Sequence, residues 1–372
     1  MQTEFPAPPS SLEPDWNELA GQASDSHYSQ IPRMERARGA RFLVTGAGGF
    51  IGAEMVRGFA ASGAEKIVLL DLCEQHSFDM YRELTAAGHG ERCVPVLGSV
   101  CDRALLAEVF AEHRPEIVLH AAALKHVALM ERNPLAAVAT NALGTWRVAQ
   151  AAEEHGARQV VLVSTDKAAA PRSIMGASKR IAELVMLAPS AMRKPAVRLV
   201  NVLGSPGSVG PLFAEQIARG GPVTVTHPEA RRYFFTLGKT AHVLGSAVAE
   251  GLDGLLVPVP GEAMRIAELA QRMIGASGSS AKIVFTELRP GEKVDEALVG
   301  LGEELGEYAS PLLRRVTSPP VAGLEARLEA LDAAVAARDV AAVLRVVIEL
   351  APDYEPSEVV LDPAAEWACE PL

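Results

Sequence analysis

The fold of the chain is decided by Arg41-Phe42-Leu43-Val44-Thr45-Gly46-Ala47-Gly48-Gly49-Phe50-Ile51-Gly52. Its apolar start predicts a short buried strand, and an apolar helical segment continues to about Ser62. The glycines between them have the spacing G-x-x-G-x-x-G, a variant of the dinucleotide-binding fingerprint. Such glycines permit a tight turn and a close approach of the backbone to a pyrophosphate at a helix N-terminus. An ordinary glycine-rich turn is the alternative, and the position between a strand and a helix argues against it. The predicted cofactor contacts here are Gly46, Gly49, Phe50, Ile51 and Gly52.

A second predicted strand, Lys66 to Leu70, ends at Asp71. Asp71 follows the last glycine of the loop by about 20 residues, the distance expected for the acid that binds the ribose hydroxyls of a dinucleotide. A carboxylate repels a 2′-phosphate, and no arginine follows immediately. The sequence therefore favours NAD over NADP as cofactor, although Asp71 could simply begin a turn.

Strand and helix patterns alternate from Arg41 to about residue 200, which is typical of a doubly wound parallel sheet. We expect an α/β fold of the Rossmann type with a smaller C-terminal substrate lobe. A single amphipathic helix is expected from Pro134 to His155. The predicted organisation is an extended or disordered arm at 1–39, an NAD-binding domain at 40–200, a substrate lobe with returns to the sheet at 201–320, and C-terminal helices and tail at 321–372.

Composition excludes several classes of protein. The chain has 372 residues, 49% of them hydrophobic, and a formal net charge of −11, which argues against binding nucleic acid or an anionic membrane surface. Its four cysteines lack paired CxxC spacing, so we expect reduced thiols and no metal site. No apolar run is long enough for a signal peptide or membrane span. These features predict a cytoplasmic protein.

We expect the catalytic residues in the segment Val160-Val161-Leu162-Val163-Ser164-Thr165-Asp166-Lys167. Four β-formers predict a buried strand that delivers polar side chains at its C-terminal end, where ligands bind in open α/β sheets. Asp166 and Lys167 could supply an acid and a base to neighbouring atoms of one substrate. A solvated salt bridge in a loop is the alternative for this pair.

A further strand ends in His120-Ala121-Ala122-Ala123-Leu124-Lys125-His126. The small alanines would let a cofactor lie against the backbone, so Ala121 and Ala122 are candidate contacts. Lys125 could reach a phosphate or sugar oxygen, but Lys125 and His126 could equally begin a solvated helix. Asn141 stands in an otherwise apolar stretch, which indicates a buried hydrogen bond that is structural rather than catalytic.

With these residues in place, the sequence resembles the nucleotide-sugar 4,6-dehydratases of the polysaccharide-biosynthesis branch of extended short-chain dehydrogenases/reductases. This group includes the UDP-N-acetylglucosamine 4,6-dehydratases. The resemblance runs from about Arg41 to Pro356. Its motifs are the glycine loop, His120 to Val127, Ser164 to Lys167, Met175 to Lys179, Asn201 to Phe213, Gly221 to Thr226, Arg232 to Thr236, Arg289 to Lys293 and Glu349 to Pro356.

The resemblance implies a bound NAD that is regenerated in each turnover. Hydride would leave sugar C4, Lys167 would take the C5 proton, Asp166 would protonate the departing C6 hydroxyl, and hydride would return to C6. Thr165 would bond the sugar 4-oxygen, and Lys179 would hold the nicotinamide ribose. Burial could keep Asp166 protonated and Lys167 neutral, and their mutual attraction would oppose this. The implied product is a UDP-4-keto-6-deoxy-N-acetylhexosamine.

Met175 is the main departure from the wider superfamily, which has a tyrosine there. A thioether cannot remove the C4 hydroxyl proton, so Asp166 or a water must assist. With methionine at this position, the sequence resembles the subgroup of 4,6-dehydratases that retains the C5 configuration. Ser99 replaces an adenine-contacting Asp, and Ala170 replaces a common Asn. The resemblance also marks substrate-binding positions: Lys125, His126, Asn201, Val209, Arg232, Arg289 and Glu292.

Two other functions remain open from the sequence. A C4 or C5 epimerase of a UDP-hexosamine would use the same fold, although it needs no acid at C6. A catalytically silent nucleotide-binding protein is suggested by Met175, Ser99 and Ala170. Members of the resembling family are often oligomeric, so a homo-oligomer is one expected partner beside the UDP-sugar.

Overall fold

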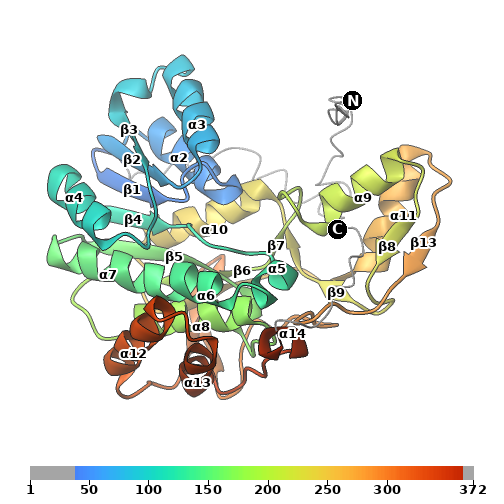
Figure 1. Cartoon of the computed structure of the whole chain (residues 1–372). Helices are drawn as coiled ribbons and strands as arrows, with labels where there is room; N and C mark the ends of the chain where they lie inside the picture. Colours follow the sequence, from blue (N-terminus) through green and yellow to red (C-terminus); the bar gives the residue numbers. More distant parts are fainter. Residues whose placement is uncertain (1–37, 363–372) are drawn as a thin grey trace, which may run out of the picture.

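The structure, a computed structural model, describes residues 38–362. A nine-stranded sheet lies at its centre in the order β14-β15-β11-β6-β5-β4-β1-β2-β3 (Figure 1). The strands from β3 to β11 run parallel, so the predicted doubly wound sheet is confirmed. They are β1 (Arg41–Thr45), β2 (Lys66–Asp71), β3 (Cys93–Leu97), β4 (Ile117–His120), β5 (Gln159–Thr165), β6 (Ala196–Leu199) and β11 (Leu255–Pro258).

Helices cover both faces of the sheet because side chains along a strand point alternately to either side. Phe42 and Val44 of β1 lie in one core, and Leu43 lies in the other. The first core is closed by α2 (Phe50–Ala61), α3 (Glu74–Ala86) and α10 (Leu237–Ala249). The second is closed by α4 (Arg103–His113), α7 (Gly144–Glu154) and α8 (Ile174–Leu187).

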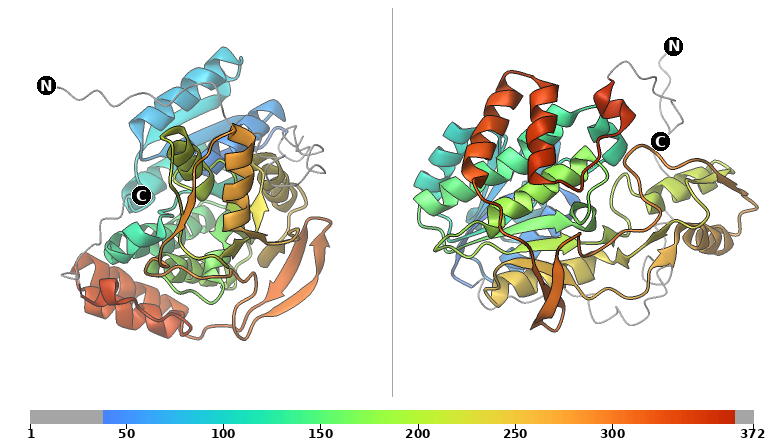
Figure 2. Two further views of the ribbon diagram at one scale, coloured as in Figure 1. Left: turned by 90° about the vertical axis from the view of Figure 1, so that its right-hand side faces the viewer. Right: turned by 90° about the horizontal axis from the view of Figure 1, so that it is seen from below.

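A further layer covers the outside of α8, as Figure 2 shows from below. It consists of α12 (Leu324–Ala336) and α13 (Val340–Leu350), whose apolar faces share a core with α8. The short α14 (Glu358–Leu361) follows. Next to it, Ser357 Oγ donates a 2.6 Å hydrogen bond to the buried carboxylate of Glu131, at the end of α5 (Val127–Glu131). The other oxygen of Glu131 accepts the backbone N–H of Ile174, the first residue of α8, at 2.7 Å.

A smaller lobe with its own core extends from the sheet (Figure 1). Its elements are β8 (Val223–Val225) paired with β13 (Ile283–Phe285), β9 (Arg231–Arg232) paired with β12 (Met264–Arg265), α9 (Val209–Ala218) and α11 (Ile266–Ser277). At its base, β7 (Asn201–Val202) pairs with β10 (Phe234–Phe235). The predicted domain boundaries stay predictions.

The structure differs from the predicted elements at three places. The expected helix 134–155 contains a π-helical turn, Val138–Leu143, between α6 (Pro134–Ala137) and α7. The sequence pattern predicts a helix from about Phe78 to Ala87, and the observed helix α3 begins one turn earlier, at Glu74. The chain also returns to the sheet as an antiparallel hairpin, β14 (Glu304–Ser310) and β15 (Leu313–Thr317), which was not predicted because its mostly exposed strand β14 lacks an apolar face. The remaining helical turns are η3 (Gly90–Arg92) and η5 (Asp166–Ala168).

Within 38–362, none of the helices is both long and apolar enough to cross a bilayer. The predicted arm at 1–39 and the end of the predicted tail fall almost wholly outside the described residues.

Candidate active site

The glycine loop turns sharply after β1 and lies against the loop that follows β4. Gly46 has φ +66°, a backbone conformation that favours glycine. A Cβ on Gly46 would lie 2.8 Å from the backbone nitrogen of Ala122, and a Cβ on Gly52 would lie 2.0 Å from the Gly46 carbonyl oxygen. Neither position could carry a side chain unless this backbone moved, so the tight turn depends on both glycines.

Asp71 is held at the end of β2 by two backbone donors. Its Oδ2 accepts the N–H of Gly48 and its Oδ1 accepts the N–H of Cys73, both at 2.9 Å. Each carboxylate oxygen keeps a second lone pair for a hydroxyl. Ser99 lies at the end of the neighbouring β3, where its hydroxyl accepts the N–H of Cys101 at 3.1 Å.

The end of β4 is fixed by a buried histidine. His120 contacts Thr45 Oγ1 at 2.7 Å and Thr145 Oγ1 at 3.0 Å. Burial, with a smaller effect of the Lys179 charge, lowers the pKa of His120 to about 3, so its ring is neutral. Thr45 also accepts the N–H groups of Ala121 and Ala122, which places both alanines beside the glycine loop.

Thr165, Asp166 and Lys167 lie at the C-terminal end of β5, as predicted. The Thr165 hydroxyl donates to Asp166 Oδ1 at 3.0 Å. Lys167 Nζ donates to the same oxygen at 3.0 Å and to Asn201 Oδ1 at 3.3 Å. Asp166 is fully buried, and its Oδ2 has no hydrogen-bond donor among residues 38–362. The pair is therefore not a solvated surface salt bridge.

The buried carboxylate of Glu296 is the site residue that sequence reasoning missed. Its Oε1 lies 3.5 Å from Lys167 Nζ, and its side chain is 3% exposed. Burial lowers the pKa of Lys167, but attraction by Asp166 and Glu296 outweighs this and leaves it raised. Of the two opposing effects expected from the sequence, attraction therefore prevails over burial at Lys167. The predicted motif Arg289 to Lys293 ended three residues before Glu296.

Helix α8 carries Met175 and Lys179. The Ser173 hydroxyl caps the helix by accepting the Gly176 N–H at 3.1 Å. Met175 is 3% exposed. Lys179 Nζ donates to the Val163 carbonyl of β5 at 2.7 Å, and burial lowers its pKa to about 8. Asn141, in the π-helical turn, bonds Leu124 N–H and carbonyl, so its predicted structural role is confirmed.

Behind β5 lies a buried network of ion pairs. Glu183 of α8 accepts the Ser164 hydroxyl at 2.7 Å and pairs with Arg198 of β6 at 2.7 Å. Arg198 pairs with Glu303 at 2.6 Å, and Arg180 contacts both carboxylates. Because Ser164 precedes Thr165, this network supports the strand end that carries the acid and the amine.

Two segments that were predicted to bind substrate contact each other. Lys125 Nζ donates to the Pro206 carbonyl at 2.8 Å. A Cβ on Gly207 would lie 2.4 Å from His126 Cε1. Val209 begins α9 directly after this loop. Ligand contacts of Lys125, His126 and Val209 stay predictions.

Arg232 is largely occupied by backbone. Its guanidinium donates to the carbonyls of Arg231, Val294 and Lys293, each at 2.7 Å, and its Nε lies 3.8 Å from Glu296. The structure thus gives Arg232 a role in holding the segment around Val294, beside the predicted contact with substrate.

The remaining predicted residues lie on the loop before this segment. The Arg289 N–H donates to Glu292 Oε2 at 3.2 Å. Ala170, close to this loop through the Lys293 contact with Ala169, has φ +44°, which Asn tolerates better than Ala. This accounts for the Asn that is common at that position.

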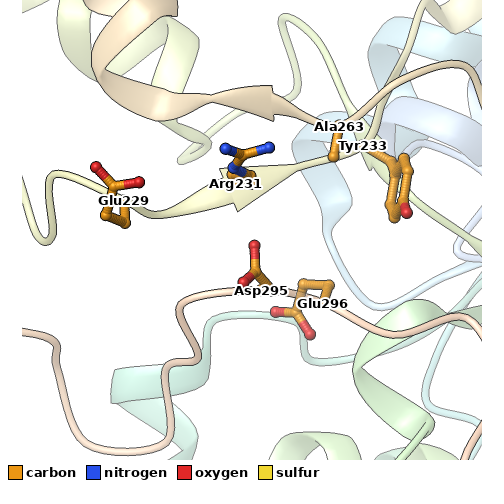
Figure 3. A pocket seen from close by; sticks show the side chains of 6 residues that line it. All are labelled: Glu229, Arg231, Tyr233, Ala263, Asp295 and Glu296. Atoms are coloured by element: carbon orange, nitrogen blue, oxygen red, sulfur yellow. The ribbon is translucent and has the colours of Figure 1, made fainter.

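A cavity of about 450 Å³ opens on the lobe side of Glu296. Figure 3 shows Glu229 and Arg231 on one wall and the carboxylates of Asp295 and Glu296 on the other; Tyr233 and Ala263 complete the lining. Glu296 therefore lines this cavity and also lies close to Lys167, the base beside Asp166. Among the described residues, His, Cys, Asp and Glu side chains form no cluster suited to a metal ion.

Known proteins are similar to most of this chain in sequence. The family model described as polysaccharide biosynthesis protein matches residues 42–316. The capsular polysaccharide biosynthesis protein CapD of Staphylococcus aureus is 43% identical over 271 residues, which cover 70% of this chain and 45% of that protein. The chain thus spans less than half the length of this curated relative.

Solved structures show the same fold. Pen from Bacillus thuringiensis is 26% identical with a TM-score of 0.70, covering 76% of this chain and 90% of that one. The dTDP-glucose 4,6-dehydratase DesIV of Streptomyces venezuelae, solved with NAD, is 25% identical, with a TM-score of 0.61 and coverages of 70% and 88%. The UDP-glucose 4-epimerase of Thermus thermophilus, also with NAD, is 26% identical, with a TM-score of 0.61 and coverages of 70% and 91%.

Proposed function

The chain belongs to the polysaccharide biosynthesis protein family, and we propose that it is an NAD-dependent nucleotide-sugar 4,6-dehydratase. Its substrate would be a UDP-N-acetylhexosamine, foremost UDP-N-acetylglucosamine. The product would be the UDP-4-keto-6-deoxy sugar with the C5 configuration retained.

NAD fits the residues at the glycine loop. The loop closes so tightly that a Cβ on Gly52 would overlap the Gly46 carbonyl oxygen, which leaves backbone to face the pyrophosphate. Asp71 is oriented by Gly48 and Cys73 with lone pairs left for ribose hydroxyls. The two solved relatives of known activity described above carry NAD, which bears out the predicted cofactor. When bound, NAD would accept hydride from C4 of the sugar and return it to C6. The proton of the C4 hydroxyl would pass to Asp166, directly or through a water, so that Asp166 is protonated when the elimination begins.

Asp166 and Lys167 would perform the elimination. Lys167 takes the proton from C5, the C5–H electron pair forms a C5–C6 double bond, and the C6–O bond breaks. Asp166 gives its proton to that oxygen, so the leaving group is water. Lys167 then returns a proton to C5 when C6 receives its hydride. Thr165, whose hydroxyl is 3.0 Å from Asp166 Oδ1, would hold the sugar 4-oxygen.

One observation carries this proposal: a buried carboxyl and an amine meet at 3.0 Å, and the second carboxyl oxygen is left without a donor in the described chain. An unpartnered buried oxygen is costly unless a ligand completes it. A hydroxyl of the sugar would do so at the position where a proton must be delivered. A simple C4 epimerase needs no such acid.

The test is turnover of UDP-N-acetylglucosamine in deuterated water. Mass spectrometry should show loss of one water, and proton NMR should show deuterium at C5. Recovery of the sugar without loss of water would contradict the proposal. A panel of UDP- and dTDP-sugars then defines the preferred nucleotide and hexose.

A C4 epimerase is the second candidate, supported by the fold shared with the Thermus thermophilus epimerase. The same incubation separates the two functions. An epimerase would give the C4 epimer at unchanged mass, with no deuterium at C5. Protein that binds NAD and UDP but converts no sugar would instead support the silent homologue.

A further inference from the structure

Glu296 is a second carboxylate close to Lys167, besides Asp166. Lys167 Nζ lies 3.0 Å from Asp166 Oδ1 and 3.5 Å from Glu296 Oε1. Asp166 comes from the end of the central strand β5, whereas Glu296 comes from the segment that leaves the smaller lobe. The amine is thus held between carboxylates that lie 130 positions apart in the chain.

Glu296 is also close to Lys293 and Arg232, but these two cations have other partners. Lys293 Nζ lies 3.4 Å from Glu296 Oε2 and donates to the Ala169 carbonyl at 3.0 Å. Arg232 binds three backbone carbonyls through its terminal nitrogens. Burial opposes ionisation of Glu296, but attraction by Lys167 first, and then by Lys293 and Arg232, holds its pKa low. The Glu296 carboxylate therefore affects the charge of Lys167 more than that of Lys293 or Arg232.

The importance of Glu296 rises when Asp166 carries a proton. The proposed dehydration requires Asp166 as an acid, hence neutral at its start. Among the residues that the structure describes, Glu296 is then the one remaining carboxylate ion-paired to Lys167. Lys167 becomes an ammonium as it takes the C5 proton, and a buried ammonium needs an anion nearby.

We propose that Glu296 is a positioning residue for the base Lys167: it fixes the amine against C5 and stabilises the ammonium that forms there. This inference rests on the proposed dehydratase function and adds a residue to it. Glu296 itself exchanges no proton with the sugar. Its buried carboxylate supplies a charge that is fixed before reaction, the arrangement by which enzymes stabilise developing charge.

The groups facing Lys167 come from four segments. Asp166 and Glu296 attract its charge, Arg232 and, more distantly, Lys293 oppose it, and Asn201 accepts a hydrogen bond. Removing the charge of Glu296 while keeping its shape must therefore leave Lys167 holding its proton less tightly. The pH at which Lys167 becomes a base falls as a result.

The experiment compares wild type with Glu296→Gln, each with its bound NAD, across a pH series with UDP-N-acetylglucosamine. We expect kcat to fall about 100-fold, the loss that a misplacement of about 1 Å can cause. KM for the sugar should change far less than kcat. The acid limb of the kcat profile should move to lower pH, a change that a merely structural role would not produce.

Glu287→Gln is the matched control, since it makes the same chemical change at an exposed position of the preceding loop. It should keep the wild-type profile. Glu296→Asp keeps the charge but withdraws it by one methylene, so its kcat should lie between wild type and Glu296→Gln with the acid limb near that of wild type. If Glu296→Gln does not fold, Glu296→Asp decides: a lowered kcat supports the inference, and a wild-type kcat overturns it.

The two failures are distinguishable. Wild type that forms no 4-keto-6-deoxy sugar overturns the dehydratase assignment, and this inference with it. Wild type that forms this product, with Glu296→Gln equal to it in kcat and in pH profile, overturns the role of Glu296 alone.

Discussion

Glu183→Gln tests whether the buried ion network behind β5 maintains the fold. The substitution keeps the size of the side chain and removes its charge. In the structure Glu183 and Arg198 are both 0% exposed and paired at 2.7 Å, while Glu183 also accepts the Ser164 hydroxyl. In the variant, an amide NH₂ would face the donors of Arg198 or Ser164.

The expected loss in the free energy of unfolding depends on which ion pairs remain in the variant. Removing one partner of a buried ion pair costs about 3–5 kcal/mol. Glu303 still binds Arg198 at 2.6 Å and Arg180 at 2.8 Å, so we expect the lower end, about 3 kcal/mol. At an unfolding entropy of about 2.1 cal/mol/K per residue over about 325 residues, this lowers Tm by about 4 °C.

Differential scanning calorimetry at neutral pH measures the effect. Glu268→Gln is the control, because its ion pair with Arg272 has a similar length, 2.6 Å, but is 45% and 39% exposed. An exposed pair of this kind contributes about 0.5 kcal/mol or less. Equal Tm losses in the two variants would refute the reasoning.

The pH dependence gives a second measurement on the same variant. Burial opposes ionisation of Glu183, but Arg198 and Arg180 outweigh it and hold its folded pKa below the unfolded value. A carboxylate with a lowered pKa stabilises the fold above its unfolded pKa, and this contribution is lost as pH falls through the folded pKa. The Tm difference between wild type and Glu183→Gln should therefore close on acidification. A constant difference would mean that charge is not its cause.

Three further predictions concern the active site. Lys167→Ala should reduce turnover by about 100-fold to 10,000-fold while keeping bound NAD, checked by product mass spectrometry and by the NAD released on denaturation; intact turnover would place the C5 base elsewhere. Asp71→Ala should weaken NAD binding about tenfold, the effect of losing a hydrogen bond to a charged group, measured by calorimetric titration; an unchanged Kd would remove its ribose role. Because burial lowers the pKa of Lys179 to about 8, its ammonium is present below that pH and lost above it. Activity should decline above about pH 8, and Lys179→Arg, if active, should retain activity to higher pH; coincident alkaline limbs would show that another group titrates.

Local sequence patterns were sufficient to predict the dinucleotide half of the molecule. The glycine loop between β1 and α2 is recognisable because its glycines meet backbone at distances that no side chain permits. Asp71 was also placed correctly at the end of the second strand, and its contact with a ribose stays a prediction. In both cases the structural cause lies within one βαβ unit, so the sequence contains the whole pattern.

Glu296 was not predictable because its partners are brought together by tertiary structure. Nothing in the residues around Glu296 indicates that its carboxylate will lie 3.5 Å from Lys167. The same holds for Arg232, whose terminal nitrogens bind backbone carbonyls of the segment around Val294. The π-helical turn at Val138–Leu143 was not predicted, because the spacing of apolar residues does not distinguish an α-helical turn from one with an extra residue.

The contact of Ser357 with Glu131 has a consequence for the order in which the protein matures. Helix α8, which carries Met175 and Lys179, is held at its first residue by a carboxylate whose other oxygen is bound by Ser357. A ribosome releases Ser357 long after it has released that helix. A nascent chain can therefore fold its glycine loop early, but the contact that holds the start of α8 forms only near the end of translation. We expect chains truncated before Ser357 to lose activity at truncations that still leave the fold stable.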